Sequence, residues 1–76
     1  MSSKGKSIEL AQGFREKIRS GEWAAGTKFE PIQKLAADCG TSVATISKVF
    51  EILENEGLIE RLNGLGVYVR EQVKYR

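Results

Sequence analysis

Short hydroxyl side chains are concentrated in one stretch of the sequence, TSVATIS, which covers residues 41–47. Serine and threonine hydroxyls can hydrogen-bond to bases or phosphates, and they can equally cap a helix. Lys48 follows directly and adds one positive charge, whereas Val43 and Ala44 between the hydroxyls are uncharged. The segment can therefore make directional hydrogen bonds to a ligand, with little electrostatic attraction of its own.

The sequence lacks the parts of a catalytic or metal site. Histidine is absent from all 76 residues, which excludes imidazole bases and histidine-ligated metals. The single cysteine, Cys39, cannot form an internal disulfide, and beside Ala36 and Ala37 it is typical of a small buried filler. The stretch NGLG at residues 63–66 lacks the strand-to-helix context of a phosphate-binding loop. We therefore expect no enzyme activity, no cofactor and no bound metal.

Charge is distributed unevenly, although the net charge of the chain is only +2. Basic residues crowd both ends of the chain, whereas the stretch after Lys48 is acidic. This distribution can leave one face positive and another negative, which suits an oriented approach to phosphates. The alternative is that these charges are ordinary solvated surface groups.

Length and composition indicate a single globular domain. Hydrophobic residues make up 41% of the chain and charged residues 29%, which is typical of a small domain with one core. No apolar run approaches the roughly 20 residues of a membrane span. The N-terminal MSSKGK lacks the apolar stretch of a secretory signal. We therefore expect a cytoplasmic protein with no membrane partner.

The first helix is predicted to begin after Ser7, a good N-cap, and to end at Gly21. Its apolar stripe recurs at helical spacing and consists of Ile8, Ala11, Phe14 and Ile18. Residues 1–6 are polar, basic and glycine-containing, so we expect them to be disordered. Trp23 stands in the connector after the helix and is expected to fold back on the core.

Two shorter helices are predicted next. The second begins at Pro31, whose missing N–H needs no partner in a first turn, and ends at Gly40. The third follows Ser42, which can cap the amide of Thr45, and ends at Gly57. The apolar face of the third helix consists of Ile46, Val49, Phe50 and Leu53.

The joint between these two helices is typical of a helix-turn-helix. Only a few residues connect them, so the helices must cross steeply at a sterically thin contact. Ala36 supplies the thin contact, Gly40 permits a left-handed turn, and Ile46 returns the third helix to the core. A plain three-helix bundle with an extended tail is the alternative.

A β-hairpin is predicted after the helices. Short strands at residues 58–62 and 67–70 flank a glycine-rich turn. The predicted fold is therefore mainly α with a small hairpin, a winged helix-turn-helix of three helices followed by two strands. This domain would cover residues 7–71, and residues 72–76 would form a C-terminal tail.

Four sequence motifs follow one another in register. They are I-x-x-G-x-x-x-x-G at residues 18–26, L-A with G and S-x-x-T-[VI] at residues 35–46, L-x-x-E-G-L-[IV] at residues 53–59, and G-x-G-x-[FY]-V at residues 64–69. Through these motifs, residues 10–69 resemble the winged-helix DNA-binding domain of the GntR family of bacterial transcription regulators. The resemblance implies a repressor-type DNA-binding regulator whose third helix enters the major groove, with the hairpin wing alongside.

The sequence departs from this family at four positions whose side chains usually contact base edges or phosphates of DNA. Three arginines and the basic residue of the wing tip are replaced by Gln33, Val43, Ser47 and Leu65. Uncharged side chains change what can be read, since apolar groups can contact thymine methyls and Gln33 can pair with adenine. Leu65 would act through shape or partial insertion. We therefore expect modest affinity with a weakened salt dependence.

The predicted DNA contacts lie at the starts of the second and third helices and on the hairpin. They are Gln33, Lys34, Thr41, Ser42, Val43, Ala44, Thr45, Ser47, Lys48, Arg61, Asn63, Gly64 and Leu65. The three basic side chains in this set would bind phosphates, assisted by Lys4 and Lys6. Double-stranded DNA is the predicted partner.

An alternative function is a winged-helix module that binds a protein and has lost DNA binding. Val43, Ala44 and Leu65 would then form an apolar streak, a feature that often marks a partner site. Members of the family carry an effector-binding or dimerising domain after the wing. The sequence leaves open whether such a domain was removed or the protein is a bare DNA reader. Because no coiled-coil heptad is present, we expect a monomer in solution that pairs only on DNA with two half-sites.

Overall fold

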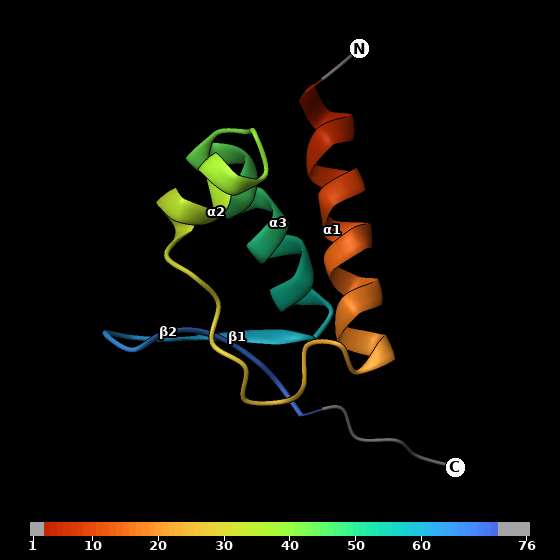
Figure 1. Cartoon of the computed structure of the whole chain (residues 1–76), viewed down its shortest axis with the longest axis vertical. Coiled ribbons are helices and arrows are strands. Elements are labelled where there is room, and N and C mark those ends of the chain that lie inside the picture. The colour runs from red at the N-terminus through yellow and green to blue at the C-terminus, as the bar shows by residue number, and fades with distance from the viewer. Residues whose placement is uncertain (1–2, 72–76) are drawn as a thin grey trace.

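The computed structural model describes residues 3–71, which form three helices followed by a two-stranded antiparallel sheet (Figure 1). The elements are α1 (Ser3–Ser20), α2 (Ile32–Asp38), α3 (Val43–Asn55), β1 (Ile59–Leu62) and β2 (Gly66–Val69). In Figure 1, α3 runs between α1 and α2, and the hairpin projects beyond the helices on the side of α2. This arrangement confirms the predicted winged helix-turn-helix. No helix in this part of the chain has the length and apolar character of a membrane span.

Helix α1 begins at Ser3, five residues before Ile8, the first helical residue of the prediction. The expectation that the basic N-terminus is disordered is therefore wrong for residues 3–6, which are helical. Each added residue gains a main-chain hydrogen bond once a helix has formed, and the lysines of this segment are good helix formers. Residues 1–2 and the predicted tail at residues 72–76 lie outside the described residues.

The face that α1 turns to the core also differs from the prediction. Ser7 does not cap the helix but lies inside it, with its side chain only 7% exposed. The buried residues of α1 are Ser7, Ala11, Phe14 and Ile18. They follow one line along the helix, at i, i+4, i+7 and i+11. Ile8 is rotated by about 100° from that line and is 61% exposed.

The joint between α2 and α3 confirms the predicted helix-turn-helix. Ala36 is buried at the crossing, and Gly40 ends α2 in the left-handed region with a φ of 65°. The hydroxyl oxygen of Ser42 accepts a hydrogen bond from the Thr45 amide at 3.2 Å and caps α3. Pro31 stands at the N-cap of α2, one position before the first turn in which it was predicted.

The connector between α1 and α2 adds a strand-like segment to the hairpin. Lys28 forms an isolated antiparallel bridge with Tyr68 of β2. On either side of this bridge, N–H···O bonds of 2.8 and 2.9 Å join the two segments. The connector is thereby held along β2, and it brings residues 28–32 close to the hairpin.

One core unites these elements. It consists of Ala11, Phe14, Ile18, Phe29, Ala36, Ile46, Val49, Phe50, Leu53, Leu58, Ile59 and Val69. Trp23 packs against this core as predicted, with its ring centroid 5.2 Å from those of Phe14 and Phe29. Because α3 buries Ile46, Val49, Phe50 and Leu53 in this core, its opposite face is left exposed to solvent.

An ion pair outside the core joins α1 to the end of α3. Both Nε and Nη2 of Arg15 donate to the carboxylate of Glu56 at 2.7 Å. The hydrogen bond from Arg15 lowers the pKa of Glu56, and the same bond raises the pKa of Arg15. The bidentate geometry favours the charged forms of both groups.

Replacing Glu56 by glutamine is expected to lower the free energy of unfolding by about 1 kcal/mol or less at neutral pH, because the pair is partly exposed to solvent. A carboxylate whose pKa is lowered by folding stabilises the fold above its unfolded pKa, and this contribution is lost as the pH falls through the folded value. The difference between wild type and variant should therefore shrink in acid.

Urea unfolding at neutral pH and at about pH 3 measures this difference. Glu9→Gln, at an exposed position of α1, is the matched control and should have little effect at either pH. If Glu56→Gln lowered the free energy of unfolding equally at both pH values, the ionised carboxylate of Glu56 would not be the source of the stabilisation.

Candidate nucleic-acid interface

The first turns of α3 present small side chains to solvent. Val43 is 43% exposed, Ala44 is exposed and Ser47 is half-buried. The hydroxyl oxygens of Ser42 and Thr45 lie 3.1 Å apart and are engaged with each other and with the helix cap. A hydroxyl has two lone pairs and one proton, so both groups keep capacity for one further partner. This surface can therefore approach another molecule closely and offer hydrogen bonds and methyl contacts.

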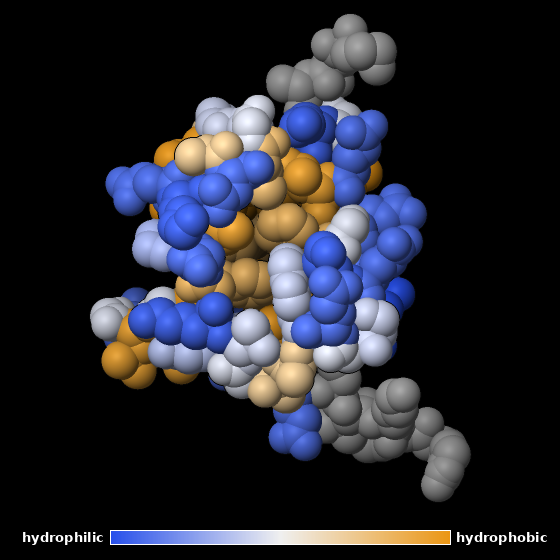
Figure 2. Space-filling view, viewed as in Figure 1, coloured by the Kyte–Doolittle hydropathy of each residue, from blue (hydrophilic) through white to orange (hydrophobic). Residues whose placement is uncertain are grey.

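The hairpin turn forms a second, protruding surface. Asn63, Gly64 and Leu65 are all exposed, and the side chain of Leu65 is 60% exposed. The turn is ordered by a main-chain bond of 2.9 Å from the Leu65 amide to Leu62. The Tyr68 hydroxyl also donates to the Leu65 carbonyl at 3.2 Å. Figure 2 shows the end of the hairpin as an apolar patch beside polar neighbours.

The start of α2 completes the predicted interface. Gln33 and Lys34 are exposed on its first turn, and Thr41 is half-buried between α2 and α3. The fold thus brings the predicted contacts together in three groups, on α2, on α3 and on the hairpin. Among the described residues, no cluster of three or more acidic or cysteine side chains is arranged to hold a metal ion.

The three predicted phosphate-binding cations all have carboxylate partners within the domain. The pairs are Lys34 with Asp38 at 3.3 Å, Lys48 with Glu51 at 3.7 Å, and Arg61 with Glu54 at 3.3 Å. Arg61 is held further by a 3.5 Å hydrogen bond to the Ser47 carbonyl and by stacking over Phe50. Its guanidinium therefore lies back along α3. Lys6 is exposed on α1.

Lys28 is a candidate phosphate contact that the sequence analysis missed. Its side chain is exposed, has no carboxylate partner among residues 3–71, and lies over the hairpin. The Cε atom of Lys28 lies so close to Gly66 of β2 that a Cβ atom added to this glycine would be only 2.9 Å away from it. No local pattern marks this position, because Lys28 falls in a connector whose pairing with β2 is a long-range contact.

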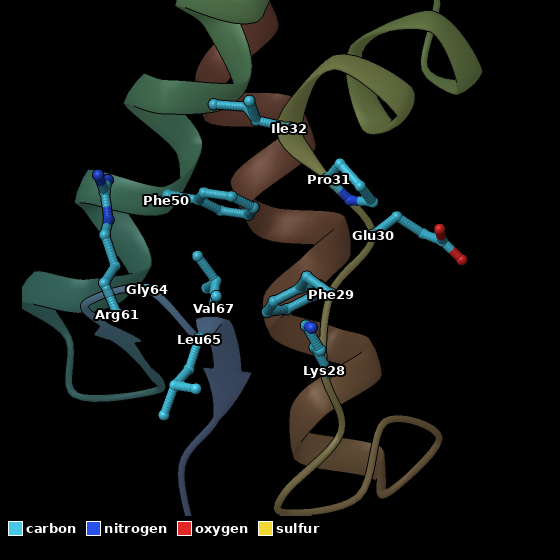
Figure 3. Close-up of a pocket in the computed structure, with 11 residues that line it drawn as sticks. Lys28, Phe29, Glu30, Pro31, Ile32, Phe50, Arg61, Gly64, Leu65 and Val67 are labelled. Atoms are coloured by element: carbon cyan, nitrogen blue, oxygen red, sulfur yellow. The ribbon is translucent and has the colours of Figure 1, made fainter.

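A groove of about 520 Å³ separates the hairpin from the start of α2 (Figure 3). Its apolar lining includes Phe29, Pro31, Ile32, Phe50, Leu65 and Val67. Lys28 and Arg61 lie on its two sides, whereas the carboxylate of Glu30 points away from it in Figure 3. Of the predicted contacts, the groove is lined by Arg61, Gly64 and Leu65, so it belongs to the hairpin side of the candidate interface.

A helix-turn-helix whose second helix is exposed at its start, next to an antiparallel hairpin, defines a winged helix-turn-helix domain. The family model for bacterial regulatory proteins of the gntR family matches residues 6–69. The chain belongs to the GntR family, and it corresponds to the DNA-binding domain of these transcription regulators.

Named relatives and a solved structure agree with this assignment. The transcriptional repressor YtrA of Bacillus subtilis is 33% identical over 66 residues, which are 87% of this chain and 51% of YtrA. The histidine utilization repressor of Klebsiella aerogenes is 36% identical over 63 residues, 83% of this chain and 26% of the repressor. The chain thus spans about a quarter to a half of their lengths.

The solved structure is AraR(DBD) in complex with operator ORR3. It is 25% identical to this chain and superposes with a TM-score of 0.78. The match covers 84% of this chain and 77% of that one.

Proposed function

We propose that this domain binds double-stranded DNA with the first turns of α3 in the major groove and the hairpin alongside, and that it acts as a repressor. The observation that carries the proposal is the exposed, small-residue start of α3 on the same side as the hairpin turn, in a member of the GntR family. AraR(DBD), which has this fold, forms a complex with an operator, and two relatives are named repressors. Both facts support the proposal. A DNA-binding regulator of a bacterium works in the cytoplasm, and we propose that location here.

The proposed reading surface relies on shape, methyl groups and amides more than on charge. Val43 and Ala44 would contact thymine methyl groups, and Gln33 can form two hydrogen bonds with an adenine. Ser47 would bond a base edge or a phosphate, and Leu65 would pack in or beside the minor groove. Sequence preference would then favour A·T pairs.

Selection of random duplexes by the purified chain tests the proposal. The expected result is enrichment of a common motif containing A·T pairs, with saturable binding at about 20 mM salt and weaker binding at about 150 mM. A chain that enriches no motif and binds no duplex at the lower salt would not be a DNA reader. The apolar side chains of Val43 and Leu65 would then favour a protein partner.

Lys28→Ala is expected to weaken binding to a mixed-sequence duplex by roughly three- to tenfold at low salt, because it removes an unneutralised cation beside the hairpin. The slope of log K against log salt should fall in magnitude by about one. Fluorescence anisotropy titrations at several salt concentrations measure both quantities. Lys17→Ala is the control and should leave the slope unchanged, since Lys17 of α1 is paired with Glu22 just after the helix. An unchanged slope in Lys28→Ala would remove Lys28 from the interface.

The 76-residue chain is proposed to be a monomer in dilute solution. The large exposed apolar side chains of the described part are Ile8, Val43, Leu62 and Leu65, which are spread over α1, α3 and the hairpin. Sedimentation at about 10–100 μM is expected to give the mass of one chain. A stable dimer without DNA would refute the proposal, and loss of that dimer in Ile8→Ser or Leu65→Ser would locate its interface.

A further inference from the structure

We infer that Asp38, Glu51 and Glu54 restrain DNA binding by occupying the three cations of the proposed interface. This inference rests on the proposed function, because it concerns how strongly the same surface attracts phosphates. The three carboxylates would act as internal competitors of the DNA backbone. Their effect would be to keep the sequence-independent part of the affinity low.

The geometry of the three pairs supports this competition. Two pairs form along helices, at i,i+4 on α2 and at i,i+3 on α3, and the third joins β1 to α3. The nitrogen–oxygen distances are 3.3, 3.7 and 3.3 Å. The side chains of all three pairs are well exposed, so a phosphate can reach each cation and replace its carboxylate. Arg61 can bind a phosphate in this way while it keeps its hydrogen bond to the Ser47 carbonyl and its place over Phe50.

A cation that already faces a carboxylate contributes less to DNA binding than a free one. The phosphate must first displace the carboxylate, and the displaced carboxylate then stays close to the phosphate and repels it. Two charges about 7 Å apart in water interact strongly enough to change an equilibrium constant by about threefold. Three such pairs together would lower the affinity by about 10- to 30-fold.

This restraint would act mainly on non-specific binding. Contacts with phosphates are the same at every site, whereas contacts with base edges differ from site to site. The proposed base-reading side chains, Val43, Ala44 and Ser47, carry no charge and form none of the three pairs. The carboxylates would therefore reduce binding to random DNA and leave base recognition as the larger share of the total.

The test compares two variants of equal charge. The first carries Asp38→Asn, Glu51→Gln and Glu54→Gln, which frees the three cations. The second carries Glu9→Gln, Glu16→Gln and Glu22→Gln, at exposed positions on α1 and just after it. Each raises the net charge by three, so a difference between them reports the position of the charge. The probe is a fluorescein-labelled mixed-sequence duplex of about 20 base pairs, titrated from about 20 to about 150 mM salt.

The first variant is expected to bind about 10- to 30-fold more tightly than wild type at low salt, with a steeper salt dependence. The control should gain clearly less, and thermal unfolding should show both variants folded. If the first variant were unfolded, Glu54→Gln alone, expected to gain about threefold, replaces it, with Glu22→Gln as its control.

Equal gains in the two variants, or no gain in the first, would overturn the inference while leaving the proposed function intact. Absence of saturable binding in wild type and in both variants at low salt would overturn the proposed function and the inference with it.

Discussion

Replacing Ala44 by glutamate is expected to abolish detectable duplex binding while the domain remains folded. Ala44 is exposed in the first turn of α3, at the centre of the proposed groove-facing surface. A carboxylate placed about 5 Å from a phosphate at the interface loses binding energy that corresponds to about 100-fold or more. Negative charge near a helix N-terminus interacts favourably with the helix dipole, so the stability should not fall.

Titration of a labelled duplex and urea unfolding of the same sample separate these two effects. Gln12→Glu adds the same side chain to an exposed position of α1 and is the matched control. The control should keep nearly all of the affinity. If Ala44→Glu bound DNA as tightly as Gln12→Glu, then α3 would not enter the groove through its first turns.

Ile46→Ala is expected to cost about 2–5 kcal/mol of the free energy of unfolding, which is a large part of the total for a domain of this size. Ile46 is fully buried and belongs to the face of α3 that packs against the rest of the fold. Removing its outer carbons leaves a cavity at the centre of a small core, and little of that cavity can close by local movement.

Val43→Ala on the same helix is the control, because Val43 is exposed and its truncation leaves no cavity. Its effect should stay within about 0.5 kcal/mol. The urea midpoints of the two variants compare the two sites directly. The burial of Ile46 indicates that the core depends on this side chain, and similar midpoints for the two variants would contradict this.

The parts of the fold that sequence periodicity predicted were those with strong local signals. The third helix combined a cap at Ser42 with four apolar residues at helical spacing, and both features are present in the structure. The turn at Gly40 was predictable because a left-handed residue at a helix end favours glycine. The start of α1 was missed, because Ser7 has the side chain of a cap but stands where the helix buries it.

The membership of the candidate site stays a prediction, and the pairing of its cations with carboxylates was not predicted from the sequence. Hydroxyl and apolar residues of α3 were identified from the family motif, and the structure places them at an exposed surface. Whether each cation of the proposed interface pairs with a carboxylate depends on the directions of the two side chains, which the sequence does not show. The pair of Arg61 with Glu54 also joins β1 to α3, so it depends on the tertiary fold as well. Lys28 could not be assigned from local sequence, since a bridge to Tyr68 brings it to the hairpin.

The sequence by itself determined the order of the elements, the helix-turn-helix joint and the absence of histidine chemistry, because these depend on neighbours along the chain or on composition alone. Tertiary structure decided which face of α1 is buried, how the connector pairs with β2 and which cations are neutralised. These features depend on contacts between residues far apart in the sequence, whose energies local periodicity does not report. The balance of free and paired cations on the proposed DNA-binding surface is therefore a property of the folded domain.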